Sequence, residues 1–335
     1  MIRTPFRFRT GNETYENSGA VRRCDGPPTG TMGAAPAVRT TLRALRSLAR
    51  RLSAAFALLA LAGAPAMAGS AAQPGQTIGA AAGAQLPVGL YFVNTSSFGV
   101  RDTRPLDSES NVNLPAFVWA TPWTLFGARL NLIAIQPVVA SSPRGTPYQS
   151  GIGQPLLAGQ LAWNLGNNFG VSYLFGGYLP IETRFLTQNA SLSHRFAASY
   201  TGDGLNLTAN LLYGIFLDSI SPQGGVYPDY LNLDLTATKK FGKWEVGPVA
   251  FASTDLPTRF PGYRRQGQIA VGGLVGYNFG PVNLQAYVTQ DVVERNYGGR
   301  ETRGWLRVIV PIYKEDTNAA APTLPVAGPG RIAGR

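Results

Sequence analysis

The sequence predicts an all-β fold: a transmembrane antiparallel up-and-down β-barrel of about 12 strands, with short periplasmic turns and longer extracellular loops. Three observations lead to this prediction. The chain is poor in charge without being hydrophobic overall, its apolar residues recur with a period of two, and its connections alternate between short and long. Each is typical of strands that face lipid on one side and a polar lumen on the other.

Composition argues against an ordinary soluble domain and against helical membrane spans. Charged residues make up 14% of the 335 residues, whereas soluble domains average about 25%. The chain has 40 Gly, and its mean hydropathy is near zero. The body of the chain has no long apolar run, so strands are the only predicted way to cross a membrane.

The net charge of +11 is concentrated near the N-terminus. Residues 1–68 hold ten Arg and three acidic residues, which leaves 19 basic and 15 acidic residues in 69–335. Because a targeting signal explains the N-terminal excess, we expect no nucleic-acid partner.

Residues 32–68 have the pattern of a signal peptide. Several arginines precede the apolar run Leu52–Gly63, and Ala66-Met67-Ala68 forms a small-x-small cleavage site. Residues 1–31 are then a non-structural extension or a mis-called start. The alternative is a genuine N-terminal tail followed by an interfacial helix. The only cysteine, Cys24, precedes the cleavage site, so the mature chain is expected to lack disulfides and Cys ligands.

The stretch Asp229–Ser253 shows the strand pattern most plainly. Aliphatic residues alternate with polar ones up to a short turn at Phe241-Gly242-Lys243, and a second alternating segment follows. A soluble sandwich has the same local pattern, so the repetition of the pattern carries the prediction. A flexible leader at 69–85 precedes the barrel at 86–313, and 314–335 is expected to be a disordered tail. The expected strands are 86–94, 112–121, 125–138, 152–164, 169–180, 190–201, 205–217, 229–240, 244–254, 267–278, 282–294 and 301–313.

The connections segregate by length. After the second, fourth, sixth, eighth and tenth expected strands the chain turns within a few residues, whereas most odd-numbered strands are followed by long loops. Such alternation places both termini on the periplasmic side. Lipid offers no hydrogen bonds, so the last strand must pair with the first. Tyr313 shares parity with Arg307, which leaves the face of Tyr313 open.

The hairpin Leu114–Ala140 (LPAFVWATPWTLFGARLNLIAIQPVVA) and the opening segment 86–102 (LPVGLYFVNTSSFGVRD) carry a family resemblance. The chain resembles the "MetA-pathway of phenol degradation" family of outer-membrane proteins over roughly 86–313. The resemblance implies a β-barrel transporter and an association with aromatic compounds. A Gly-Asp-Ile segment expected after the second loop is replaced by Gly151-Ile152-Gly153-Gln154.

Sites for bond chemistry are sparse. Alternation places the single histidine, His194, on the lipid face, away from a Ser or carboxylate that catalysis would need. We therefore predict no enzyme activity, no cofactor and no metal site. Arg259, Arg264 and Arg265 form either a lipopolysaccharide contact or a solvated basic loop.

The polar parity of the clearer strands predicts the lumen lining. These side chains serve either as the lining of a passage or as filling that rigidifies the barrel. The predicted residues are Arg129, Asn131, Arg195, Asn206, Asn210, Asn232, Asp234, Lys240, Gln285, Asp291, Arg303 and Arg307.

These features predict an exported protein of the bacterial outer membrane that passes small solutes passively, with aromatic or hydrophobic compounds implied by the resemblance. Its partners would be outer-membrane lipid and lipopolysaccharide, a small-molecule solute and the barrel-assembly machinery. The alternatives are a surface-anchor barrel that binds a partner through its loops and, third, an outer-membrane enzyme.

Overall fold

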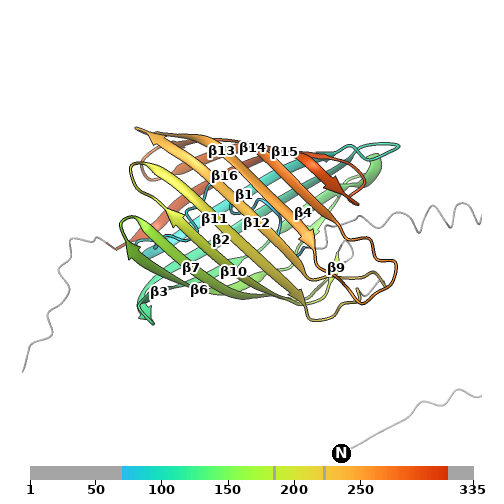
Figure 1. Cartoon of the computed structure of the whole chain (residues 1–335), viewed down its shortest axis with the longest axis horizontal. Helices are drawn as coiled ribbons and strands as arrows, with labels where there is room; N and C mark the ends of the chain where they lie inside the picture. Colours follow the sequence, from blue (N-terminus) through green and yellow to red (C-terminus); the bar gives the residue numbers. More distant parts are fainter. Residues whose placement is uncertain (1–69, 184–185, 222–223, 316–335) are drawn as a thin grey trace, which may run out of the picture. The chain divides into compact units, whose positions relative to one another are not determined.

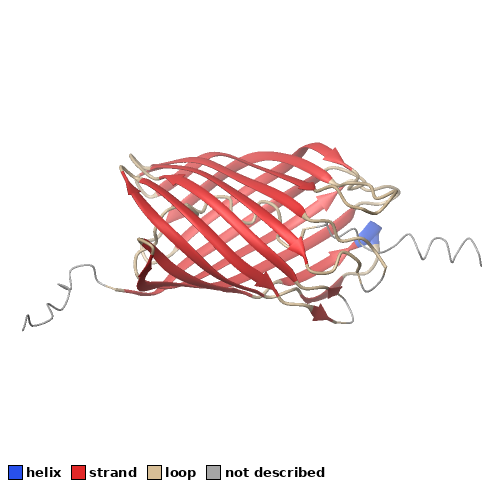
Figure 2. Ribbon diagram, turned by 60° about the horizontal axis from the view of Figure 1, so that its bottom comes forward, coloured by secondary structure: helices blue, strands red, loops and turns tan. Residues whose placement is uncertain are grey.

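The structure, a computed structural model, describes residues 70–183, 186–221 and 224–315. Almost all of the regular structure is strand (Figures 1 and 2). The predicted signal peptide at 32–68, the extension at 1–31 and most of the tail lie outside the described residues. Within them, no helix is long and apolar enough to cross a membrane.

Twelve strands form the closed antiparallel barrel, which confirms the predicted fold. Each pairs with the next along the ring, and β16 pairs with β1 to close it. In ring order they are β1 (Gly89–Arg101), β2 (Ser108–Leu125), β3 (Ala128–Ile135), β6 (Leu156–Gly166), β7 (Phe169–Tyr178), β10 (Ser191–Tyr200), β11 (Leu205–Phe216), β12 (Tyr230–Phe241), β13 (Trp244–Asp255), β14 (Gly267–Asn278), β15 (Asn283–Arg295) and β16 (Glu301–Lys314).

Short elements lie at one end of the barrel. β4 (Val138–Ser142) and β5 (Gln149–Ile152) continue the β3 and β6 directions and flank the 3-10 turn η1 (Pro143–Gly145). β8 (Ile181–Glu182) and β9 (Thr187–Gln188) form a separate small hairpin. We call this the loop end, and the opposite end, where the tight turns lie, the turn end.

From Phe169 onward the expected strand limits lie within one or two residues of the observed ones. The earlier strands differ. Prolines, which have no N–H for the ladder, interrupt the third and fourth expected strands at Gln136-Pro137 and Gly153–Pro155. The first strand begins at Gly89 rather than Leu86 and continues to Arg101, beyond the expected limit at Asn94.

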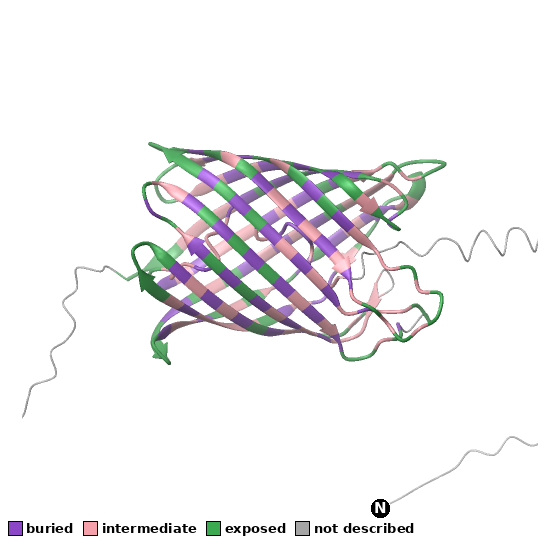
Figure 3. Cartoon of the chain, viewed as in Figure 1, coloured by how far each residue is buried: buried purple, intermediate pink, exposed green. Residues whose placement is uncertain are grey.

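Alternation along the strands is the basis of the barrel's two faces. Buried and more exposed residues follow one another along each strand, visible as purple bands alternating with pink and green ones (Figure 3). In β12 the buried set is Tyr230, Asn232, Asp234, Thr236 and Thr238, and leucines alternate with it. The polar set therefore faces inward and the aliphatic set outward, as expected for strands in lipid.

Tyr313 reaches the outer face through an irregularity in the closing seam. The β1–β16 register shifts between Leu90 and Tyr91, whose partners are Tyr313 and Pro311, so Ile312 is an extra residue. A bulge of one residue reverses parity. Tyr313 is 61% exposed, although it shares its sequence parity with the buried Arg307.

The closing seam yields a first prediction. Ser96 and Leu306 are register partners on the outer face of β1 and β16, so cysteines at both positions should form a disulfide in a C24S background. Non-reducing gels after mild oxidation would show the crosslink. Ser96 paired with Val310, whose register partner is Phe92, is the control. Equal crosslinking of both pairs would contradict the observed register.

Candidate functional site in the lumen

Residues 70–88, which we call the lumen segment, run through the interior of the barrel. Near the loop end the Ala72 N–H donates to the Tyr230 hydroxyl at 3.2 Å. Near the turn end the Gly83 N–H donates to Ser199 Oγ at 2.9 Å, and Arg129 Nη1 donates to the Leu86 carbonyl at 2.5 Å. This placement differs from the flexible leader expected at 69–85. The small Gly and Ala side chains of the segment let it fit between the walls.

Asp234 anchors the first turn of the lumen segment. Its carboxylate is 2% exposed and accepts hydrogen bonds from the Gly75 N–H at 2.8 Å and the Thr77 N–H at 2.9 Å. Thr77 Oγ1 also donates to it, at 2.6 Å. A buried carboxylate is tolerated only when its lone pairs are satisfied, and here the segment's own donors supply the partners.

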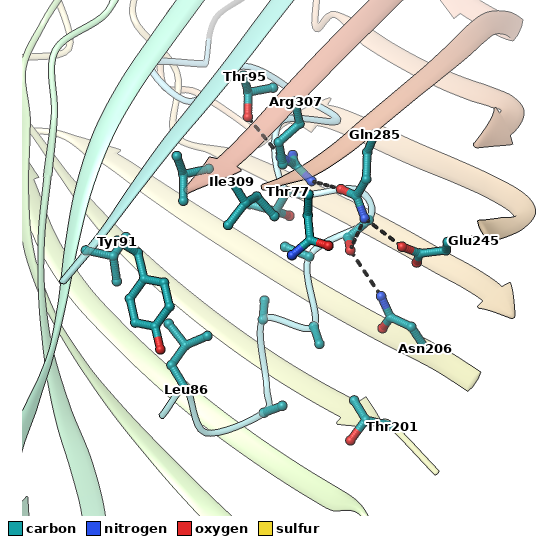
Figure 4. Close-up of a pocket in the computed structure, with 18 of the residues that line it drawn as sticks. Thr77, Leu86, Tyr91, Thr95, Thr201, Asn206, Glu245, Gln285, Arg307 and Ile309 are labelled. Atoms are coloured by element: carbon teal, nitrogen blue, oxygen red, sulfur yellow. Dashed lines mark hydrogen bonds between the residues drawn. The ribbon is translucent and has the colours of Figure 1, made fainter. Parts of the chain in front are cut away.

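Arg307 anchors the next turn through the segment's carbonyls. It donates to the Gln76 carbonyl at 2.5 Å, to the Ile78 carbonyl, and to Thr95 Oγ1 of β1 at 2.9 Å. Gln285 Nε2 donates to Gly79 O at 3.1 Å and to Glu245 at 3.0 Å (Figure 4). The lumen segment is therefore fixed by charged groups on the walls of β12 and β16.

The segment also approaches the wall closely at a pair of glycines. A Cβ added to Gly83 would lie 2.7 Å from the Ser199 nitrogen and 2.8 Å from the Gly170 carbonyl oxygen. A Cβ on Gly170 would lie 2.6 Å from Gly83 O. Backbone atoms cannot yield at such distances, so glycine is required at both positions.

A cavity of about 560 Å³ lies between the lumen segment and the strands. Its lining extends from the middle of the barrel to residues of the turns, including Thr201, Gly204, Gly242 and Lys243. Among the described residues, none from the loop-end connections lines it. The cavity therefore reaches the turn end of the barrel.

Two clusters of buried side chains occupy the interior from the middle of the barrel toward the loop end. Aromatic and aliphatic residues of several strands pack against Ala72 in one cluster and against Ile78 in another. The first contains Leu156, Tyr178, Leu212, Phe216 and Tyr230. The second contains Val249, Phe251, Ala270, Leu274, Tyr287 and Trp305.

The cavity has two chemically different walls. Inward-facing residues of β1, β2, β3 and β7 are mostly apolar, whereas Gln160 of β6 and residues of β10 to β16 supply amides and charges. In Figure 4, Tyr91 lies on one side of the lumen segment and the Arg307, Gln285 and Glu245 group on the other. The apolar wall includes Tyr91, Val93, Leu114, Ala116, Val118, Ile133, Ile135 and Leu174.

Positive charge predominates in the lining. In the part of the chain that the structure describes, four basic residues line the cavity, namely Arg195, Lys240, Lys243 and Arg307, against one acidic residue, Glu245. The difference, four minus one, is a formal charge of +3. A confined passage with this excess attracts anions.

Most residues predicted from parity to line the lumen are buried in the structure. They are Asn131, Arg195, Asn206, Asn210, Asn232, Asp234, Gln285, Asp291, Arg303 and Arg307. Arg129 is half-buried beside Leu86, and Lys240 is exposed at the turn end but lines the cavity. Sequence parity does not distinguish residues that line the cavity from those that hold the lumen segment.

Asp291 and Arg303 belong instead to an ionic network at the loop end. Arg303 Nη2 lies 2.6 Å from Glu301 Oε1, and Arg101 lies 3.5 Å from both Asp291 and Glu301. The Arg101 guanidinium also lies 4.8 Å from the centroid of the Tyr297 ring. Burial raises the pKa of Tyr297, in the loop after β15, to about 12.

The sequence prediction omits Glu245, Glu301 and Arg101. Glu245 lies on the polar face of the alternation in its strand, so the sequence pattern did indicate its inward position. Glu301 is the first residue of β16 and Arg101 the last of β1, where a two-residue period has too few neighbours to define a face. Strand ends therefore account for two of the three omissions.

His194 lies outside this site. Alternation in β10 buries Ser193 and Arg195, so His194 faces outward, where its Nδ1 lies 2.9 Å from the Tyr173 hydroxyl. The Tyr213 ring stacks on the His194 ring, and the Phe175 ring packs against it at a tilt. Among the described residues, no group of three or more His, Cys, Asp or Glu side chains could hold a metal ion.

Comparison with a solved channel structure shows the same fold. The COG4313 outer membrane channel from Pseudomonas putida F1 matches with a TM-score of 0.57 and 16% identity, covering 68% of this chain and 97% of that chain. The β domain of the Bordetella autotransporter BrkA matches with a TM-score of 0.41 and 12% identity, covering 66% of this chain and 99% of that chain. No curated protein matches the sequence.

A family model covers most of the barrel. The model described as "Putative MetA-pathway of phenol degradation" matches residues 94–308, which include ten complete barrel strands and parts of the two seam strands, β1 and β16. This match spans more than half of the chain and confirms the resemblance seen in the opening strand and hairpin. The chain therefore belongs to the family described by that model.

Proposed function

We propose that this protein is a pore of the bacterial outer membrane through which small solutes, including aromatic or hydrophobic ones, pass by passive diffusion. The observation that carries the proposal is the cavity beside the lumen segment, enclosed by a barrel of outer-membrane type. Export would use the signal peptide at 32–68, cleaved after Ala68. Lipid, lipopolysaccharide and the barrel-assembly machinery would be its partners.

The two-walled cavity supports passage without bond chemistry. Apolar side chains on β1 to β3 offer a surface for the body of a solute. Amides and charges on the opposite wall form hydrogen bonds with water and with the polar groups of the solute. The packed loop-end half is the barrier. Because the lumen segment contributes Ala72 and Ile78 to that packing, its displacement would extend the cavity toward the loop end.

Single-channel recording tests the proposal. The full-length protein, expressed and purified from outer membranes, would be inserted into a planar bilayer. Discrete current steps are expected. A bilayer that stays sealed, with folding confirmed by heat-shifted gel mobility, would overturn the pore and favour an anchor barrel whose loops bind a partner.

Ion selectivity gives a second prediction. Replacing Lys240 and Lys243 by Gln removes two of the four cavity cations, so the pore's anion preference should fall. The reversal potential in a KCl gradient measures this. Lys239→Gln is the matched control, because Lys239 precedes Lys240 in β12 and does not line the cavity. An unchanged reversal potential in the double variant would contradict the prediction.

A further inference from the structure

We propose that the cavity holds a binding site for amphipathic organic monoanions, with an apolar body against the β1 to β3 wall and a carboxylate on Arg195. This inference rests on the proposed pore function and names its solute class. It is carried by the surroundings of Arg195 and by the position of the apolar wall.

Arg195 is a buried cation that faces the cavity and has no salt bridge to any residue that the structure describes. It is 7% exposed and lines the cavity. Its Nε donates to Ser193 Oγ at 3.3 Å and its Nη2 to the Tyr178 hydroxyl at 3.0 Å, both neutral partners. By contrast, Arg101 and Arg303 have carboxylate partners among the described residues.

Asp234 does not neutralise this cation by direct contact. The two groups interact electrostatically, but the Asp234 oxygens accept hydrogen bonds from Gly75 and Thr77. A buried guanidinium with only neutral hydrogen-bond partners is a strong site for a carboxylate, which accepts from it with charge-assisted geometry. A bound anion would complete the charge balance at Arg195.

The apolar wall begins directly beside Arg195. Leu174 of β7 is its register partner, and both side chains line the cavity. Gln160 of β6, the register partner of Leu174, also lines the cavity, and beyond it Ile133, Leu114 and Val93 line it on β3, β2 and β1. A solute with its carboxylate on Arg195 would therefore place its carbon body on this wall. The cavity volume of about 560 Å³ lies within the range of small-molecule sites.

Calorimetric titration of the full-length protein in a neutral maltoside detergent tests the site. Benzoate is the probe. Benzyl alcohol keeps the aromatic ring without the carboxylate, and acetate keeps the carboxylate without the ring. Benzoate should bind at least about tenfold more tightly than either, because only it uses both walls. Hexanoate should bind like benzoate, since the wall is aliphatic. Equal affinity for benzoate and benzyl alcohol would overturn the proposal.

Substitutions on each wall test the carboxylate contact and the apolar contact separately. Arg195→Gln should weaken benzoate at least about tenfold and leave benzyl alcohol unchanged, whereas Arg195→Lys should keep the preference for benzoate. Ile133→Trp should weaken both ligands by filling the cavity. Arg300→Gln, in an exposed loop-end position, is the control. Gel mobility confirms that each variant is folded. Unchanged benzoate binding in Arg195→Gln would overturn the site.

Current recordings on the same samples separate this inference from the pore function. Benzoate binding that depends on Arg195, in a protein that conducts no current, would retain the site and reject the pore. Current steps without such binding would retain the pore and reject the site.

Discussion

Replacing Asp234 by Ala is expected to release the lumen segment and to raise the single-channel conductance at least about twofold, since conductance grows with the open cross-section. The variant removes three hydrogen bonds that the carboxylate accepts from Gly75 and Thr77. Hydrogen bonds to a charged group contribute about 1.5–3 kcal/mol each, so the docked state should be disfavoured on the order of a hundredfold or more.

The control for this variant is Asp255→Ala. Asp255 is also a buried inward-facing carboxylate, but its described partners are Tyr263 and Gln266 at the loop end. Asp255→Ala also removes a buried carboxylate but no contact to the lumen segment, so it should leave the conductance unchanged. A cysteine at Ala72, fully buried beside Tyr230, reports the segment directly in a C24S background. Its maleimide labelling should accelerate in Asp234→Ala.

Two results would count against a displaceable segment. One is equal conductance in Asp234→Ala and Asp255→Ala. The other is a conductance increase without faster labelling at position 72, which would place the barrier elsewhere in the packed loop-end half.

Much of the barrel follows from local sequence, because each strand's two faces meet different solvents. The alternation of Leu and polar residues in β12 sets both its limits and the inward position of Asn232 and Asp234. The register of β1 against β16 could not be predicted from local sequence. The bulge at Ile312 reverses parity only because β16 pairs with another strand.

The lumen segment was outside the reach of sequence reasoning for a different reason. Its small residues have no period of 2 or 3.6, so composition predicts flexibility. Its order comes from partners more than a hundred residues away, such as Asp234 and Arg307. Alternation does place a carboxylate and several arginines inside a narrow barrel. Because such buried charges need hydrogen-bond partners, they were the sequence signal that could have pointed to a segment inside the lumen.

Glu301→Gln is expected to lower the free energy of unfolding by about 3–5 kcal/mol, the usual cost of breaking a buried ion pair. Glu301 of β16 accepts from Arg303 Nε at 3.1 Å and Nη2 at 2.6 Å, and Arg101 of β1 lies 3.5 Å away. Arg303 in turn donates to Ser97 of β1 and Ser110 of β2. The network therefore links strands on both sides of the closing seam.

Urea unfolding of protein reconstituted in lipid vesicles measures this loss. Glu182→Gln, at an exposed loop-end position, should change the free energy of unfolding little. The double variant Glu301→Leu, Arg303→Met should cost less than Glu301→Gln, because it leaves no unpaired guanidinium at position 303. Arg101 would retain Asp291 at 3.5 Å and the Gly299 carbonyl at 2.7 Å. A double variant less stable than Glu301→Gln would show that packing at the seam, rather than charge pairing, provides the stability.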